Sequence, residues 1–206
     1  MLIEHPVYSL AIAVIFGMVY RKHTGRELSW IIVMSVYAPD LDLVATYALS
    51  ALTSLGITTF TEPCGCPLDL HGDFHNLSFL LLYAAIVAFL LNHWGFRFWD
   101  AFVFAGVGFG AHLIEDALVF KQAYPIFWPL TARIFGIGVV EYQADFYGIA
   151  DTTVLTWGLV FLLAAITLRT LYERKNWWKE LIISNSNQAN KFRQSSVSIV
   201  QSSDSK

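Results

Sequence analysis

The stretch Gly110-Ala111-His112-Leu113-Ile114-Glu115-Asp116-Ala117 decides the fold of this chain. It places a histidine and two carboxylates inside the run from Phe96 to Phe120, which is otherwise mostly apolar. In a helix, His112 and Asp116 lie one turn apart on one face, with about 5–6 Å between their Cβ atoms. This spacing suits two ligands of one metal ion. An acid near the centre of a membrane costs roughly 2.5–3.5 kcal/mol, so the pair indicates a partner or a function.

The composition around this stretch is typical of an integral membrane protein. Hydrophobic residues make up 56% of the 206 and charged residues only 14%, with a mean hydropathy of +0.53, which is unlike a water-soluble globular protein. Seven tryptophans fit helices anchored at membrane interfaces. The net charge of −3 argues against nucleic-acid binding. The bilayer is therefore the first partner to expect.

Five apolar segments predict an all-α, multi-pass transmembrane helical bundle with about five spans. Pro39 interrupts the second segment, which predicts a break or kink there. The membrane domain covers residues 1–182, and the tail 183–206, rich in Ser, Asn and Gln, is expected to be disordered. The five segments are Pro6–Tyr20, Leu28–Leu55, Leu77–Trp94, Phe96–Phe120 and Ile149–Tyr172.

Basic residues predict the orientation in the cell membrane. They follow the first, third and fifth segments, so that with five spans all three clusters fall on one side, which the positive-inside rule makes cytoplasmic. The C-terminus is then cytoplasmic, while the N-terminus and the loops 56–76 and 121–148 lie outside. The clusters are Arg21, Lys22 and Arg26, then Arg97, then Arg169, Arg174, Lys175 and Lys179.

Potential metal ligands come from four separate segments, all toward the outer side of this topology. A catalytic ion takes at least three protein ligands from positions that the fold brings together. The sequence therefore predicts a metal site in the outer half of the membrane. The candidates are His5 before the first segment, Asp40 and Asp42 in the second, His71 and His75 before the third, and His112 and Asp116 in the fourth.

Each candidate also has a simpler interpretation. His5 can be an interfacial residue, and Asp40 and Asp42 can cap a helix that restarts after Pro39. His71 and His75 can be ordinary loop residues. Glu115 faces away from His112 on a helix, which favours a role supporting the ligands or as a general base over a role as ligand.

The order and spacing of these motifs resemble the YdjM-type family of predicted membrane-bound metal-dependent hydrolases, from His5 to about Leu130. The family opens with a His before its first apolar segment, as His5 stands here. Its Pro-Asp-x-Asp motif is matched by Pro39-Asp40-Leu41-Asp42. Its His-x-x-x-Asp motif is matched by His112 and Asp116, and a following Trp-Pro pair by Trp128-Pro129.

One block of the family pattern departs in this chain. The family block is His-Arg-Gly-x-Thr-His-Ser, and residues 70–76 are its nearest match. Its Gly and second His coincide with Gly72 and His75, its first His falls on Leu70, and His71 takes the place of its Arg. Whether His71 substitutes as a ligand stays open.

The residues and the resemblance together imply a metal-dependent hydrolase that uses metal-activated water. The expected cofactor is one or two divalent ions, most simply zinc. The ligand set is similar to that of the all-helical zinc phospholipase C and P1 nuclease group, which implies a phosphoester substrate, and a site at the outer surface favours a lipid or lipid-linked one. The expected ligands are His5, Asp40, His75, His112 and Asp116, with His71 as a further candidate, and the expected catalytic residues are Glu115 and Asp42.

Two other functions remain open from the sequence. A metal or proton transporter would use the same intramembrane acids and histidines, but it requires polar residues along a route to both faces. The cytoplasmic half shows only scattered Ser and Thr. A noncatalytic membrane protein would use the metal only to staple helices, through a closed four-ligand site without bound water.

Overall fold

The computed structural model describes residues 3–57, 70, 72–122, 124–173 and 177. Apart from two isolated β-bridges, the regular elements of these residues are helices. This architecture confirms the predicted all-α class. The helices are α1 (Glu4–Thr24), α2 (Ser29–Met34), α3 (Leu41–Ser54), α4 (Leu77–His93), α5 (Phe98–Val119) and α6 (Thr152–Glu173).

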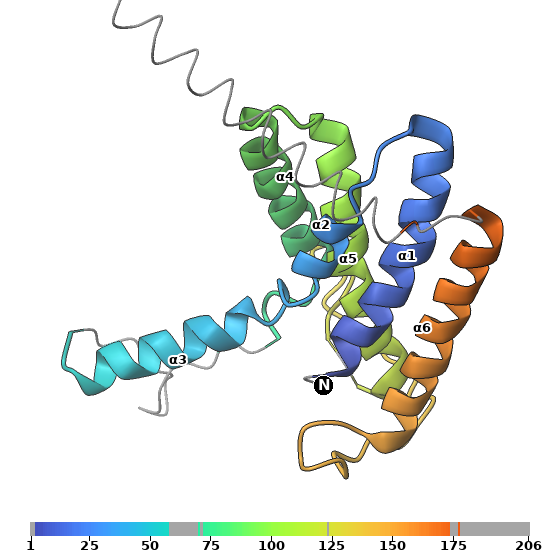
Figure 1. Cartoon of the computed structure of the whole chain (residues 1–206). Helices are drawn as coiled ribbons and strands as arrows, with labels where there is room; N and C mark the ends of the chain where they lie inside the picture. Colours follow the sequence, from blue (N-terminus) through green and yellow to red (C-terminus); the bar gives the residue numbers. More distant parts are fainter. Residues whose placement is uncertain (1–2, 58–69, 71, 123, 174–176, 178–206) are drawn as a thin grey trace, which may run out of the picture.

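The long helices form a bundle around α5. Helix α4 packs on α5, α6 packs on α1, and the short α2 lies against both α1 and α5 (Figure 1). Helices α5 and α6, with 22 residues each, are long and apolar enough to cross a membrane, because 22 residues of helix extend about 33 Å. Helices α3 and α4 are apolar but shorter. The number of spans therefore stays a prediction.

The second apolar segment is broken, as Pro39 predicts. Helix α2 ends at Met34 and α3 begins at Leu41, with turns between them. Beyond the break, α3 leaves the bundle at a steep angle to α1 (Figure 1). Residues 28–55 therefore do not run as one straight span, although sequence alone allowed either a kink or a break.

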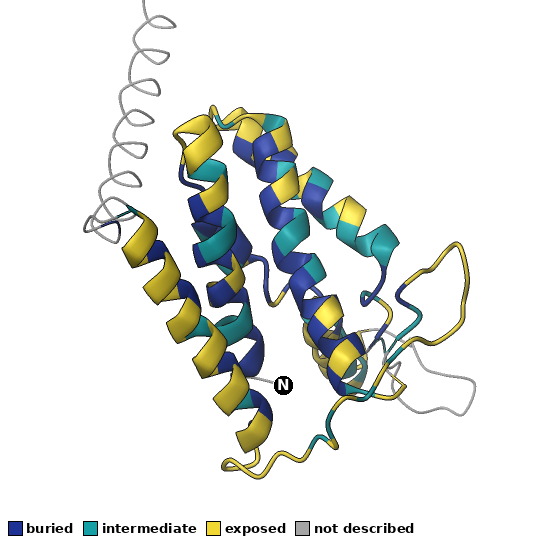
Figure 2. Ribbon diagram, turned by 90° about the vertical axis from the view of Figure 1, so that its right-hand side faces the viewer, coloured by how far each residue is buried: buried dark blue, intermediate teal, exposed yellow. Residues whose placement is uncertain are grey.

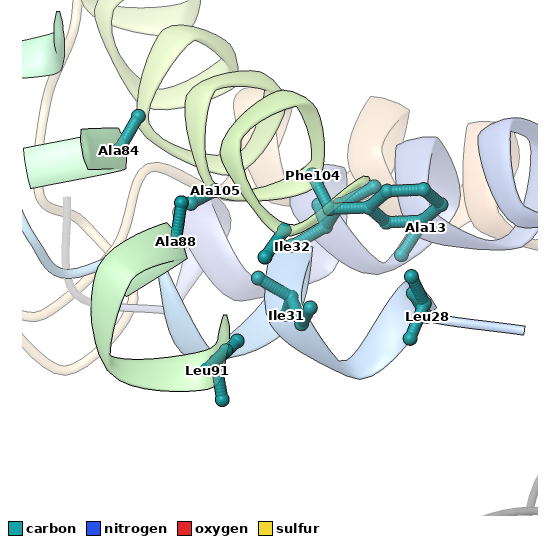
Figure 3. Close-up of a cluster of buried hydrophobic side chains, with 10 residues drawn as sticks. Ala13, Leu28, Ile31, Ile32, Ala84, Ala88, Leu91, Phe104 and Ala105 are labelled. Atoms are coloured by element: carbon teal, nitrogen blue, oxygen red, sulfur yellow. The ribbon is translucent and has the colours of Figure 1, made fainter. Parts of the chain in front are cut away.

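The core at the α4–α5 contact is built from small side chains. Ala84 and Ala88 of α4 belong to one buried cluster with Ala105 of α5 (Figure 3). Ala101 of α5 belongs to the same cluster, and all four alanines are fully buried. Small residues let two helix backbones approach closely, which is how helices associate in lipid. The same cluster includes Phe104, which fills the space toward α1 and α2.

The outward faces of the bundle are mostly apolar, and exposed residues run along them in Figure 2. Helix α5 is mostly buried, whereas α6 is mostly exposed, as expected of a helix that faces lipid. The last turns of α1 and α6 and the first turn of α5 lie at one end of the bundle (Figure 1). We call it the basic end, because it carries Arg21, Lys22 and Arg97. Which side of the membrane it faces stays a prediction.

Candidate metal centre

Three histidines from three different segments meet at the end of the bundle opposite the basic end. His5 lies in the first turn of α1, His75 precedes α4, and His112 lies in α5. All three are at most 3% exposed. The rings of His5 and His112 stack with 3.7 Å between centroids, and the rings of His75 and His112 meet edge to face at 5.3 Å.

Two carboxylates complete the group. Asp116 places Oδ2 3.4 Å from His112 Nε2 and 3.7 Å from His75 Nε2, and its Oδ1 lies 3.6 Å from His5 Nε2. Asp40 places Oδ1 3.7 Å from His75 Nε2 and 3.8 Å from His112 Nε2. The donors form two overlapping sets that share His112: His5, His112 and Asp116, and Asp40, His75 and His112.

In each of the three histidines, Nε2 faces the cluster and the other ring nitrogen, Nδ1, lies within hydrogen-bond distance of an oxygen atom. Glu115 Oε2 lies 2.8 Å from His5 Nδ1, and Asp42 Oδ2 lies 3.0 Å from His75 Nδ1. A neutral histidine that donates its Nδ1 hydrogen to such an oxygen presents the Nε2 lone pair on the opposite side. This is the arrangement found behind most metal-bound histidines. The sequence predicted Glu115 and Asp42 as catalytic residues, and that role stays a prediction.

The third imidazole is held by the backbone at the break between α2 and α3. His112 Nδ1 lies 2.8 Å from the carbonyl oxygen of Val36. Carbonyls at a helix end lack intrahelical partners, and Pro39, three residues later, has no N–H to offer this one. Pro39 thus does more than break the segment, because it leaves an acceptor for a buried histidine.

The loop that carries His75 is fastened to the start of α3. Asp42 Oδ2 accepts hydrogen bonds from the backbone N–H groups of Gly72, at 2.8 Å, and Phe74, at 3.4 Å. Gly72 has φ +96°, and a Cβ there would lie 2.9 Å from the Tyr124 ring. That ring packs on His75 with 4.0 Å between centroids. Position 72 therefore requires a glycine. Gly72 and His75 are the two residues of the family block that this chain retains.

Further carboxylates tie the loop before α6 to the start of α1. Glu4 is fully buried, and its Oε1 accepts hydrogen bonds from the Asp151 N–H, at 2.7 Å, and the Tyr142 hydroxyl, at 3.2 Å. Asp151 in turn caps α6, because its Oδ1 accepts from the N–H groups of Thr153 and Val154. This network fixes the position of His5, the neighbour of Glu4.

The donor set fits a divalent cation. His112 Nε2 is buried and has no hydrogen-bond partner among the described residues, which is costly unless a ligand occupies that nitrogen. Two ligands about 2.1 Å from a tetrahedral ion lie about 3.4 Å apart, close to the distances between these donors. Among the ion pairs of described residues, the carboxylates of this site meet only histidines, and no described arginine or lysine offsets them.

The charge state of His75 reflects its surroundings. Burial disfavours the imidazolium, but the carboxylates of Asp40 and Asp42 outweigh burial and raise the pKa of His75 to about 9. Without a metal, this imidazole therefore holds a proton at neutral pH. An incoming cation has to displace that proton.

A family model described as YdjM inner membrane protein matches residues 1–177. The chain belongs to the YdjM inner membrane protein family. The match spans all six helices and every residue of the site, which confirms the resemblance seen in the sequence and establishes a membrane protein. Comparisons with curated proteins and with solved structures returned no match.

In this YdjM family member, the structure brings together most of the residues that the sequence singled out. Five predicted ligands share one cluster: His5, Asp40, His75, His112 and Asp116. Glu115 and Asp42 lie directly behind two of them, and His71 lies outside the described residues. Sequence reasoning missed the Val36 carbonyl, Tyr124 and Glu4. The position of Pro39 could have indicated the free carbonyl of Val36. Nothing in the sequence pattern marked Tyr124 or Glu4.

Proposed function

We propose that this chain is a membrane-embedded metal-dependent hydrolase that cleaves a phosphoester or ester of a lipid or lipid-linked substrate. The observation that carries the proposal is the convergence of three imidazole Nε2 atoms and two carboxylates, each imidazole held from behind by an oxygen. Structural support of every ligand histidine is a feature of tuned metal sites.

The bound cation would supply the reactive chemistry. Imidazole and carboxylate donors suit zinc, and such an ion lowers the pKa of a bound water to about 7 and polarises the bond to be cleaved. The residues that would hold it are His5, Asp40, His75, His112 and Asp116. The two overlapping donor sets are compatible with one ion or two.

The protein residues orient the site, and one of the described ligands reaches the surface. Glu115, Asp42 and the Val36 carbonyl fix the three imidazoles, so that no ligand has to reorganise during the reaction. Among the ligands, the His5, His75, His112 and Asp116 side chains are at most 4% exposed, whereas Asp40 is 31% exposed. A catalytic site keeps an open position, and the Asp40 side is where a substrate would enter.

The surroundings of that opening favour a lipid. Asp40 directly precedes α3, and large apolar side chains of this helix stand exposed next to it, among them Leu41, Val44 and Tyr47. A helix that is apolar and uncovered by protein is suited to hydrocarbon. A hydrophobic substrate could therefore reach the carboxylate without leaving the bilayer.

The test is the loss of metal and activity together. His112→Ala and Asp116→Ala, purified from membranes, should lose zinc by elemental analysis and lose hydrolysis of phosphatidic acid in mixed micelles and of p-nitrophenyl phosphate. His93→Ala, an exposed histidine at the far end of α4, is the matched control and should keep both. Unchanged metal content in the two site variants would overturn the proposal. Metal flux in proteoliposomes, without turnover of any ester, would replace it with a transporter.

A further inference from the structure

The seam between α1 and α6 carries an apolar groove that the proposed hydrolase does not use. The two helices lie side by side and run in the same direction (Figure 1). Small residues are part of its lining, Ala11 on α1 and Ala164 and Ala165 on α6, together with Phe16 and Phe161. Its volume is about 570 Å³. Because small residues line it, the seam leaves room that larger side chains would fill.

The groove has the length of one hydrocarbon chain. On α1 its lining extends from Tyr8 to Val19, a rise of about 16 Å. Half of a bilayer's hydrocarbon core is about 15 Å thick. The groove therefore spans roughly one leaflet, and its lining side chains are nearly all hydrocarbon.

A second hollow continues the seam at the basic end. It has a volume of about 220 Å³. Three charged residues line it, Arg21, Lys22 and Glu173, together with Met18 and Tyr172, whereas the lining of the groove is apolar. Met18 is the neighbour of Val19, and Tyr172 lies one turn after Leu168, both of which line the groove. The two hollows thus follow one another along the same pair of helices.

The charges of this second hollow are not balanced. Glu173 serves two arginines, since its Oε2 lies 3.5 Å from Arg21 Nη1 and its Oε1 accepts from Arg169 Nε at 3.3 Å. Lys22 is exposed, and its ammonium lies 5.2 Å from the centroid of the Tyr172 ring. Among the ion pairs of described residues, none offers Lys22 a carboxylate. Among the described residues that line the hollow, two cations therefore share one carboxylate, and Lys22 is available to an anionic group that enters.

We propose that this seam binds one anionic phospholipid of the leaflet at the basic end, with an acyl chain in the groove and the phosphate beside Lys22 and Arg21. The order of the two hollows, apolar toward the membrane centre and cationic at its edge, matches the polarity of such a lipid. Basic pockets between membrane helices are suited to anionic head groups. The cationic hollow lies at the opposite end of the bundle from His5, so the bound phosphate would not contact the candidate metal ligands.

The experiment measures which lipid stays bound. Protein reconstituted into vesicles of equal parts phosphatidylglycerol and phosphatidylcholine is re-extracted in mild detergent, and native mass spectrometry counts the retained lipids. Wild type should keep about one phosphatidylglycerol per chain. Lys22→Gln should lower that preference about fivefold, and Ala164→Trp should abolish retention, because the indole fills the groove.

Matched controls separate the site from general effects. Leu163→Trp adds the same bulk one residue away, outside the residues that line the groove, and Lys121→Gln removes a charge just after α5, at the other end of the bundle. Both should retain lipid as wild type does, and zinc content should be unchanged in every variant. Equal retention of the two lipids by wild type, or an equal loss in Leu163→Trp, would overturn the proposal.

Discussion

Two buried polar clusters lie at opposite ends of the bundle, and they differ in charge balance. At the basic end, Arg169 is fully buried, with Nη2 2.5 Å from Glu27 Oε2 and Nη1 3.2 Å from the Val14 carbonyl oxygen. We call Glu27, Arg169 and Glu173 the ionic clamp. In the metal centre, four carboxylates surround three histidines, and no described arginine or lysine pairs with them.

This difference in charge balance indicates that the two clusters have different roles, one in stability and one in ligand binding. A buried charge costs several kcal/mol unless a partner offsets it, and the clamp contains its own partner. In the candidate metal centre, a protonated His75 partly offsets the four carboxylates, and no described arginine or lysine does, so a cation from outside the chain would stabilise the cluster. The clamp also places polar groups in the half of the bundle where the sequence showed only Ser and Thr. They are locked in ion pairs, which does not favour a transport path.

The largest effect on stability is expected from Arg169→Ala. This change leaves Glu27 buried without its cation, which should lower the free energy of unfolding by about 3–5 kcal/mol. Denaturant titration in detergent measures it. The double variant Arg169→Met with Glu27→Leu should recover most of the loss, because it removes both charges together.

A second measurement on Arg169→Ala is its zinc stoichiometry, the number of zinc ions bound per folded chain. It should stay at the wild-type value in the folded fraction of Arg169→Ala, because the clamp holds no ligand of the metal centre. A loss of zinc equal to that of His112→Ala would show that the two clusters are not separable.

A smaller effect, specific to the metal centre, is expected from Glu115→Gln. Removing the carboxylate behind His5 Nδ1 weakens the imidazole as a ligand, and such changes cost about 10- to 100-fold in metal affinity. Competition with a zinc chelator measures the affinity. Glu173→Gln removes a carboxylate from the clamp instead and should leave zinc affinity at the wild-type value. Equal affinities for Glu115→Gln and wild type would mean that Glu115 does not support His5.

A still smaller effect is expected from pH. The pKa of His75 is raised to about 9 in the metal-free protein, and a cation binds only the deprotonated ring. Zinc affinity should therefore fall as pH is lowered from 8 to 7, by at most about tenfold for this one proton. Proton release on zinc addition, followed with a pH indicator, checks it. Binding without proton release at pH 7 would exclude His75 as a ligand.

The sequence predicted which candidate ligands converge better than it predicted the contacts between helices. His112 and Asp116 follow from helix periodicity, and His5, Asp40 and His75 from their order along the chain. The clamp does not follow from any local pattern, because Glu27 and Arg169 are far apart in sequence. The sequence alone therefore places Arg169 with the basic cluster that follows the fifth segment, whereas the structure buries it inside α6. The direction of α3 likewise depends on turns after Met34 that no spacing encodes.

The smallest effect is expected beside the metal centre itself, at two glycines of α5. A Cβ at Gly110 would meet only the Leu80 Cδ1, at 3.5 Å, so Gly110→Ala should stabilise the helix by about 0.5–1 kcal/mol. A Cβ at Gly108 would strike the Ile32 carbonyl oxygen and lie 2.8 Å from Ser35 Cβ. Gly108→Ala should therefore destabilise the α2–α5 contact. Unfolding midpoints in detergent measure both changes.

Zinc affinity distinguishes the two glycines further. Gly108→Ala displaces the end of α2, where the carbonyl of Val36 holds His112, so it should weaken zinc binding as well as stability. Gly110→Ala, although two residues from His112, should leave zinc affinity unchanged, because it adds only an ordinary contact. Weaker zinc binding in Gly110→Ala alone would contradict the view that the backbone behind His112, rather than general packing around it, positions this ligand.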